Sequence, residues 1–137
     1  MEIKWVDTHC HLQLLNKNLD ENHFKNIEFL VIPGVDVESS SKAKEISSSL
    51  EVESYWSAGL HPHDAKLLDT QRHDLEKLFV EADLIGETGL DFYRNLSTKE
   101  QQRENFLFHL EFSKQLNKPI IVHCRDSFQD TYDLLVE

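Results

Sequence analysis

Two histidines, His9 and His11, stand one residue apart near the start of the chain, in the segment WVDTHCHL at 5–12. The residues before them predict a β-strand, and because side chains alternate across a strand, Asp7, His9 and His11 should share one face. Two imidazoles aimed at one point are typical of a divalent-metal site, since neutral imidazole is a common protein ligand. A strand-end cap and a loop hydrogen bond explain an isolated pair about equally well.

Three later segments repeat this layout, in which a strand-like apolar run is followed at once by a histidine or a carboxylate. They read WSAGLHPH at 56–63, LIGETGLD at 84–91 and PIIVHCRD at 119–126. The repetition favours one shared site over an isolated histidine pair.

Between these strands the apolar residues recur with a helical period, so the chain alternates β with α. One stripe is Leu75, Leu78, Phe79 and Ala82, and another is Phe106, Leu110, Ser113 and Leu116. Ser97 and Glu100 have capping-box spacing at the start of the second helix, and Pro119 lies just beyond its end.

Further helices are predicted at 43–50, after Asp36, and from Asp126 or Ser127 onward, with a weaker helical signal at 16–26. Regular β/α alternation indicates a parallel sheet with helical crossovers, either a closed barrel or a doubly wound open sheet. Ligands after four strands converge at the axis of a barrel, whereas an open sheet would string them along a line. The sequence contains no Gly-rich nucleotide-binding motif, so the barrel is favoured.

The four motifs together resemble the N-terminal signatures of the TatD deoxyribonucleases. They are DTHCHL at 7–12, GLHPH at 59–63, GETGLDFYR at 86–94 and PIIVHCRD at 119–126, in the same order along the chain. This resemblance implies an α/β fold of the (β/α)8 TIM-barrel type and a metal-dependent hydrolase that acts on DNA phosphodiesters.

The resemblance also implies the metal ligands. It assigns His9 and His11 to one divalent ion, His123 to a second, and Glu87 as a bridge between the two. A bridging ligand needs two oxygens and a negative charge, which a carboxylate offers and an imidazole does not. A related branch of amidohydrolases uses a carboxylated lysine here, and no lysine stands near this strand end.

Two cations about 3.5–4 Å apart can hold an attacking hydroxide and stabilise the leaving oxygen of a phosphoryl displacement. Asp7 is then a catalytic candidate that orients the imidazoles or accepts a proton, with a strand-end carboxylate as the alternative. The native ions are not fixed by the sequence, because histidine and carboxylate ligands suit Zn, Mn, Fe and, less comfortably, Mg.

Five residues are candidates for substrate binding. Arg94 and Arg125 offer guanidinium forks that match phosphate oxygens, and Tyr93 could stack on a nucleobase. For His61 and His63 the resemblance indicates the phosphate side of the site, with loop packing beside a helix capped by Asp64 as the alternative.

Composition restricts the partners. Lys and Arg number 14 against 25 Asp and Glu, a net charge of −11, so attraction to DNA or a small phosphodiester must be local to the metals and arginines. The sequence shows neither a signal-peptide core nor a stretch long enough to span a bilayer. Cys10 and Cys124 look like reduced, buried thiols turned toward the helices, so we expect a cytoplasmic protein without a membrane partner.

Length limits the assignment, because a (β/α)8 barrel typically takes about 250 residues and this chain has 137, with five strand signals. We expect 1–137 to be the N-terminal portion of a single barrel, weakly active alone because a further metal histidine and aspartate of the family have no counterpart. Its exposed strand edges would bind a missing C-terminal segment or a second copy. The alternatives are another metallohydrolase of the amidohydrolase superfamily and a non-catalytic barrel fragment.

Overall fold

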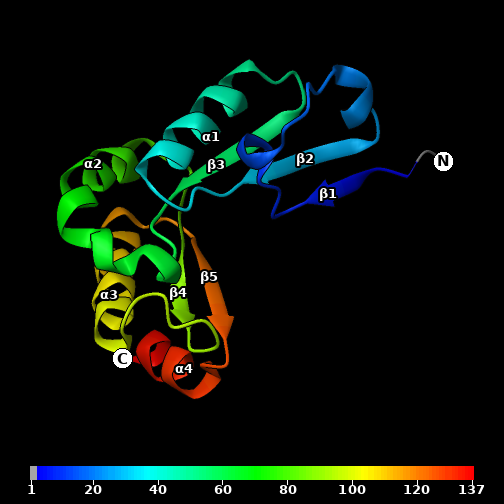
Figure 1. Ribbon diagram of the computed structural model, residues 1–137. Coiled ribbons are helices and arrows are strands. Elements are labelled where there is room, and N and C mark those ends of the chain that lie inside the picture. Colours follow the sequence, from blue (N-terminus) through cyan, green and yellow to red (C-terminus); the bar gives the residue numbers. More distant parts are fainter. Residues whose placement is uncertain (1–2) are drawn as a thin grey trace.

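The computed structural model describes residues 3–137, in which strands and helices alternate (Figure 1). The strands are β1 (Trp5–Asp7), β2 (Ile27–Ile32), β3 (Glu53–Ala58), β4 (Leu84–Asp91) and β5 (Ile120–Arg125). The α-helices are α1 (Val37–Ser49), α2 (Leu68–Glu81), α3 (Lys99–Leu116) and α4 (Phe128–Val136). Three short 3₁₀ helices are η1 (Leu12–Leu14), η2 (Glu21–Phe24) and η3 (Pro62–Leu67).

The five strands form one parallel sheet in the order β1-β2-β3-β4-β5. A doubly wound sheet reverses its strand order at a switch point, so this sequential order is that of a barrel wall. In Figure 1 the sheet curves, with α1, α2 and α3 together on one side of it. The (β/α)8-type prediction is therefore confirmed as a half-barrel.

The main core lies between the sheet and these helices. Leu75 and Phe79 of α2 are fully buried and belong to the same hydrophobic cluster as Ile32 of β2 and Trp56 of β3. The periodicity of these apolar residues predicts the helix, and burial of their stripe stabilises the helix against the sheet.

Helix ends differ from the predictions at α1, which begins at Val37 rather than at 43, and at α3. Asp36 caps α1, with its carboxylate accepting from the backbone N–H of Ser39. The predicted cap of α3 was one residue early, because Thr98 is the N-cap and pairs with Gln101. Ser97 is buried instead, and its hydroxyl donates to the carbonyl of His63.

Two smaller expectations are corrected. The weak helical signal at 16–26 corresponds only to the short η2, whose cap is the Asp20 side chain. Cys124, expected to be buried, is exposed, because β5 lies at the sheet edge and only the short α4 follows it.

Cys10 does lie against the core, and its thiol donates to the Val31 carbonyl at 3.2 Å. Burial raises the pKa of Cys10 to about 11. Within residues 3–137, no helix is long and apolar enough to cross a bilayer.

Strands β4 and β5 approach each other closely where Gly89 lies opposite His123. Gly89 has φ +137°, and a Cβ there would lie 2.0 Å from the carbonyl oxygen of His123. Only glycine fits this combination of backbone angle and contact. Gly89 therefore keeps β4 and β5 at the separation that brings their site residues together.

Candidate metal centre

Glu87 of β4 lies at the centre of the polar cluster, with 9% of its side chain exposed. Its Oε2 is 3.3 Å from Nε2 of His9 and 3.4 Å from Nε2 of His11. Its Oε1 is 3.2 Å from Nδ1 of His123. Each carboxylate oxygen thus faces a different histidine group, which is the arrangement expected of a bridging ligand.

The first group consists of His9, His11 and Glu87, whose ligand atoms lie within 4.8 Å of one another. The pair follows β1, which ends at Asp7, so both rings stand on the loop beyond the strand. Nδ1 of His11 is 3.0 Å from the Pro33 carbonyl and must donate to it. In the neutral ring, the Nε2 lone pair then faces both Glu87 and Nε2 of His9, at 3.1 Å. Converging lone pairs and a carboxylate fit a cation.

The second group consists of His61, Glu87 and His123, also within 4.8 Å. Nε2 of His61 lies 3.2 Å from Nδ1 of His123 and 3.9 Å from Oε1 of Glu87. Nδ1 of His61 accepts the backbone N–H of His63 and so caps η3. Asp64, the alternative cap considered from the sequence, stands inside η3 instead.

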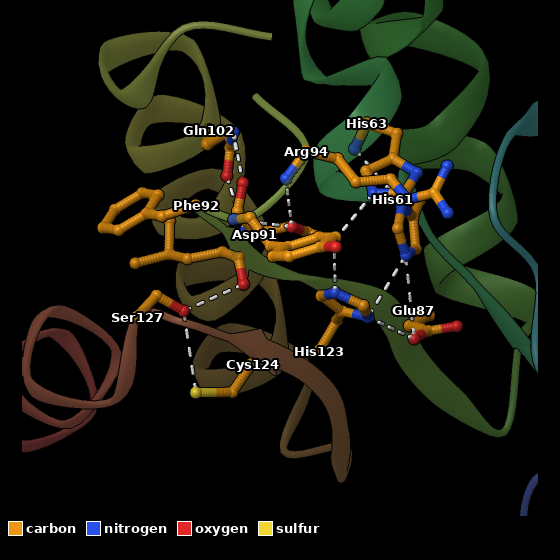
Figure 2. Close-up of polar contacts among 12 residues, drawn as sticks. His61, His63, Glu87, Asp91, Phe92, Arg94, Gln102, His123, Cys124 and Ser127 are labelled. Carbon is orange, nitrogen blue, oxygen red and sulfur yellow. Dashed lines mark hydrogen bonds and ion pairs between the residues drawn. The ribbon is translucent and has the colours of Figure 1, made fainter. Parts of the chain in front are cut away.

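Asp91, at the end of β4, is a site residue whose role the sequence motifs do not indicate. Its fully buried Oδ2 lies 2.7 Å from Nε2 of His63 and 3.0 Å from Nε2 of His123 (Figure 2). Strand alternation could have identified it, because residues 87 and 91 share one face of β4. His63 is therefore connected to the site by its contact with Asp91.

Helix α3 holds the loops of the site with three fully buried polar residues. The Gln102 amide bonds both the backbone N–H and the carbonyl of Asp91. The Asn105 amide donates to the Leu60 carbonyl, and His109 Nε2 accepts the Leu60 N–H. These three side chains fix the backbone at Leu60, just before His61, and at Asp91. Their sequence signal is a set of polar residues spaced i, i+3 and i+7 beside the apolar stripe.

The local charges shift several pKa values. Burial would raise the pKa of Glu87, but the neighbouring imidazoles of His11 and His123 hold the pKa below its usual range. Burial likewise opposes ionisation of Asp91, and its backbone and imidazole donors again keep its pKa low. Burial lowers the pKa of His61 to about 4, so this ring is neutral at physiological pH.

The remaining predicted site residues lie around this cluster. Oδ1 of Asp7 accepts the backbone N–H of His9 at 3.0 Å, which shapes the turn into the histidine pair. The Arg125 guanidinium lies over the ring of Tyr93, 3.9 Å from its centroid, and both are exposed. Arg94 is exposed on the loop after β4, and its backbone N–H donates to Asp91.

Comparison with known proteins gives concordant results. The family model described as TatD related DNase matches residues 6–137. The uncharacterized metal-dependent hydrolase YcfH of Escherichia coli K12 is 32% identical over 144 residues, which cover 96% of this chain and 53% of YcfH. The 3'-5' ssDNA/RNA exonuclease TatD of the same organism is 36% identical over 110 residues, covering 77% of this chain and 42% of that protein.

Among solved structures, the TatD homologue YJJV from Escherichia coli K12 superposes with a TM-score of 0.86 at 21% identity. The match covers 99% of this chain and 56% of YJJV, and it shows that the two share a fold. This chain thus spans about half the length of the relatives it matches.

Proposed function

Because this chain belongs to the TatD-related DNase family of metal-dependent hydrolases, we propose that it carries the N-terminal half of a phosphodiesterase that uses two divalent metal ions. The observation that carries the proposal is the position of Glu87, whose two oxygens face two separate histidine groups. A residue that only paired with one histidine would not need both oxygens turned inward.

The donor set fits two divalent cations. His9, His11 and Glu87 would hold one, and Glu87 with His123 would hold the other, with Zn, Mg or Mn as candidate ions. Bound cations would supply Lewis-acid chemistry, polarising a phosphodiester and lowering the pKa of water. We propose that residues 1–137 are the N-terminal portion of one barrel, whose later strands complete the ligand set.

The chain's own residues divide the remaining work. Neutral His61 accepts a backbone N–H at Nδ1, so its Nε2–H is a donor that can bind a phosphate oxygen beside the metal ligands. Arg125 can bind phosphate at the rim, and Tyr93 beneath it offers a face on which a base can stack. Arg94 on the neighbouring loop is a second phosphate-binding candidate.

We propose DNA as the substrate class, with small phosphodiesters as simpler substitutes. The name of the related TatD exonuclease supports a nucleic acid. The net charge of −11 means that substrate must be attracted locally, by cations and rim arginines. We further propose a cytoplasmic location, supported by two free cysteines. The partner we propose is the remaining half of the barrel, which would cover the free edges of β1 and β5.

The test combines metal analysis with a nuclease assay on purified 1–137. We expect at least one tightly bound divalent ion per chain and weak, EDTA-sensitive cleavage of single-stranded DNA. Glu87→Gln should lose both metal and cleavage, because an amide cannot bridge two cations. Glu81→Gln, which removes a surface carboxylate paired with Lys44, is the matched control and should change neither.

Two outcomes would count against the proposal. Less than one bound ion per chain would favour a non-catalytic fragment. Hydrolysis of small carboxylic esters or lactones that persists in Arg94→Ala and Arg125→Ala, without DNA cleavage, would favour another metallohydrolase of the same superfamily.

A further inference from the structure

Asp91 makes contacts that no other carboxylate of the cluster makes. It is completely buried, and one oxygen lies within hydrogen-bond distance of two imidazoles from different elements. We propose that Asp91 is a positioning residue that fixes the tautomer of His123, so that Nδ1 of His123 is the atom offered to a metal, while it also holds His63 in place. The inference deepens the proposed function and rests on it.

The proton positions follow from the chemistry of a carboxylate. An ionised carboxylate has no hydrogen to give, so each ring nitrogen bonded to Oδ2 must donate. In the neutral ring, Nε2 of His123 therefore carries the proton and Nδ1 carries the lone pair, which can accept the Nε2–H of His61 at 3.2 Å; Oε1 of Glu87 lies 3.2 Å from the same Nδ1. Carboxylates behind metal-binding histidines commonly set the tautomer in this way and raise the basicity of the ligand nitrogen.

The carboxylate of Asp91 has little freedom to turn. Its other oxygen, Oδ1, accepts the backbone N–H groups of Tyr93 and Arg94 at 3.1 and 3.0 Å. Its own backbone is held by Gln102 of α3, as Figure 2 shows. Oδ2 is thus kept pointed at the two imidazoles, which is the property required of a positioning residue.

His61 has the opposite tautomer. Its Nδ1 accepts the backbone N–H of His63, so its proton is on Nε2, beside the lone pair of His123. Two adjacent rings therefore present different groups to the same space, one a ligand lone pair and the other a hydrogen-bond donor. The fold sets this difference through Asp91 on one ring and the backbone of η3 on the other.

Asp91→Asn should invert the arrangement. The two backbone N–H groups require an acceptor, so the amide oxygen takes the place of Oδ1 and the NH2 group faces the imidazoles. Nε2 of His123 must then accept, which moves its proton to Nδ1 and removes the lone pair from the metal side. We expect the affinity for Zn²⁺ to fall about 10–100-fold.

The experiment measures two properties of the chain. Long-range ¹H–¹⁵N NMR of the metal-free protein at pH 8 reports the tautomer of each imidazole ring, and single His→Gln variants assign the signals. Calorimetric titration reports the affinity for Zn²⁺. We expect Nε2–H at His123 and His63 in the wild type and Nδ1–H in Asp91→Asn. Asp91→Glu, which keeps the charge, should retain Nε2–H.

Asp83→Asn is the matched control. Asp83 lies just before the opposite end of β4 and also accepts a backbone N–H, that of Trp56, so its loss should leave tautomers and Zn²⁺ affinity unchanged. Nδ1–H at His123 in the wild type, or unchanged tautomers and affinity in Asp91→Asn, would overturn the inference. If Asp91→Asn does not fold, the wild-type tautomer decides. Failure of the wild type to bind any of Zn²⁺, Mn²⁺ and Mg²⁺ would instead refute the proposed function, and the metal-free spectrum would still test Asp91.

Discussion

The two histidine groups that face Glu87 are held in different ways. His9 and His11 stand on a loop beyond a three-residue edge strand, with 44% and 26% of their side chains exposed. In the second group, His123 shares with His63 the carboxylate of Asp91, which has no exposed side-chain surface, and the backbone of Asp91 is fixed by α3. The β4–β5 side of the site is thus preorganised by the fold, whereas the β1 side depends more on what Glu87 and a bound ion provide.

The largest effect on stability should come from a substitution at Gly89, where β4 and β5 approach each other closely. Gly89→Ala places a methyl group 2.0 Å from the His123 carbonyl at a φ that alanine disfavours. We expect a loss of about 3–5 kcal/mol in the free energy of unfolding, measured by urea denaturation. Val80→Ala, at an exposed position of α2, is the control and should cost less than about 1 kcal/mol. Equal losses in the two variants would show that the close approach is not required.

The second effect is a dependence of the free energy of unfolding on pH, caused by His109 of α3. Both ring nitrogens of His109 are hydrogen-bonded in the neutral form, and burial lowers its pKa to about 4. The unfolded chain takes up a proton near pH 6.5 while the folded chain does not, so stability should fall as pH drops from about 6.5 to 4. This group alone contributes a loss of about 3 kcal/mol over that window.

His109→Gln keeps an acceptor for the Leu60 N–H and removes the titration. Urea denaturation across pH 4–8 should therefore show a shallower slope in this variant than in the wild type. An identical slope would mean that His109 does not remain neutral when folded.

A third, smaller effect compares one type of bond on the two sides of the site. The Asn105 amide donates to the Leu60 carbonyl on the α3 side, and the Gln13 amide donates to the Pro33 carbonyl on the His11 side. Asn105→Ala leaves a buried carbonyl unpaired and should cost about 2–3 kcal/mol. Gln13→Ala, at a half-buried position, should cost less than about 1 kcal/mol. A reversed order in urea denaturation would contradict the contrast between the two sides.

The smallest effect is expected at Asp7. Its structural contact is the backbone N–H of His9, and the side chain is exposed. Asp7→Asn retains an acceptor oxygen, so Zn²⁺ affinity measured by calorimetry should change less than about threefold. A loss as large as that expected for Asp91→Asn would support the catalytic role considered for Asp7 and would remove the distinction between the two carboxylates.

The sequence predicted the parts of the site that depend on periodicity and local motifs. Strand-like runs ending in His61, Glu87 and His123 place polar groups at one edge of a parallel sheet, and the structure brings these residues together. The barrel order followed from the same argument. These predictions require only that the strands run parallel, so that their carboxyl ends meet at one edge of the sheet.

What the sequence did not indicate depends on tertiary partners. Asp91 belongs to the motif at 86–94, but its role depends on β5 and η3, which bring the rings of His123 and His63 to one of its oxygens. The roles of Gln102 and Asn105 on α3 could not be predicted from the sequence, because these buried side chains bond backbone atoms that lie 11 and 45 residues away along the chain. Cap positions such as Thr98 differ from their neighbours only in detailed backbone geometry.

The unequal environments of the two cysteines give an experimental handle. Cys10 gives its hydrogen to the Val31 carbonyl and, with a pKa of about 11, holds almost no thiolate at neutral pH, whereas Cys124 is exposed on the strand that carries His123. A maleimide dye should therefore attach at Cys124 first. Without any engineered cysteine, the chain would carry a fluorescent reporter one residue from a proposed ligand.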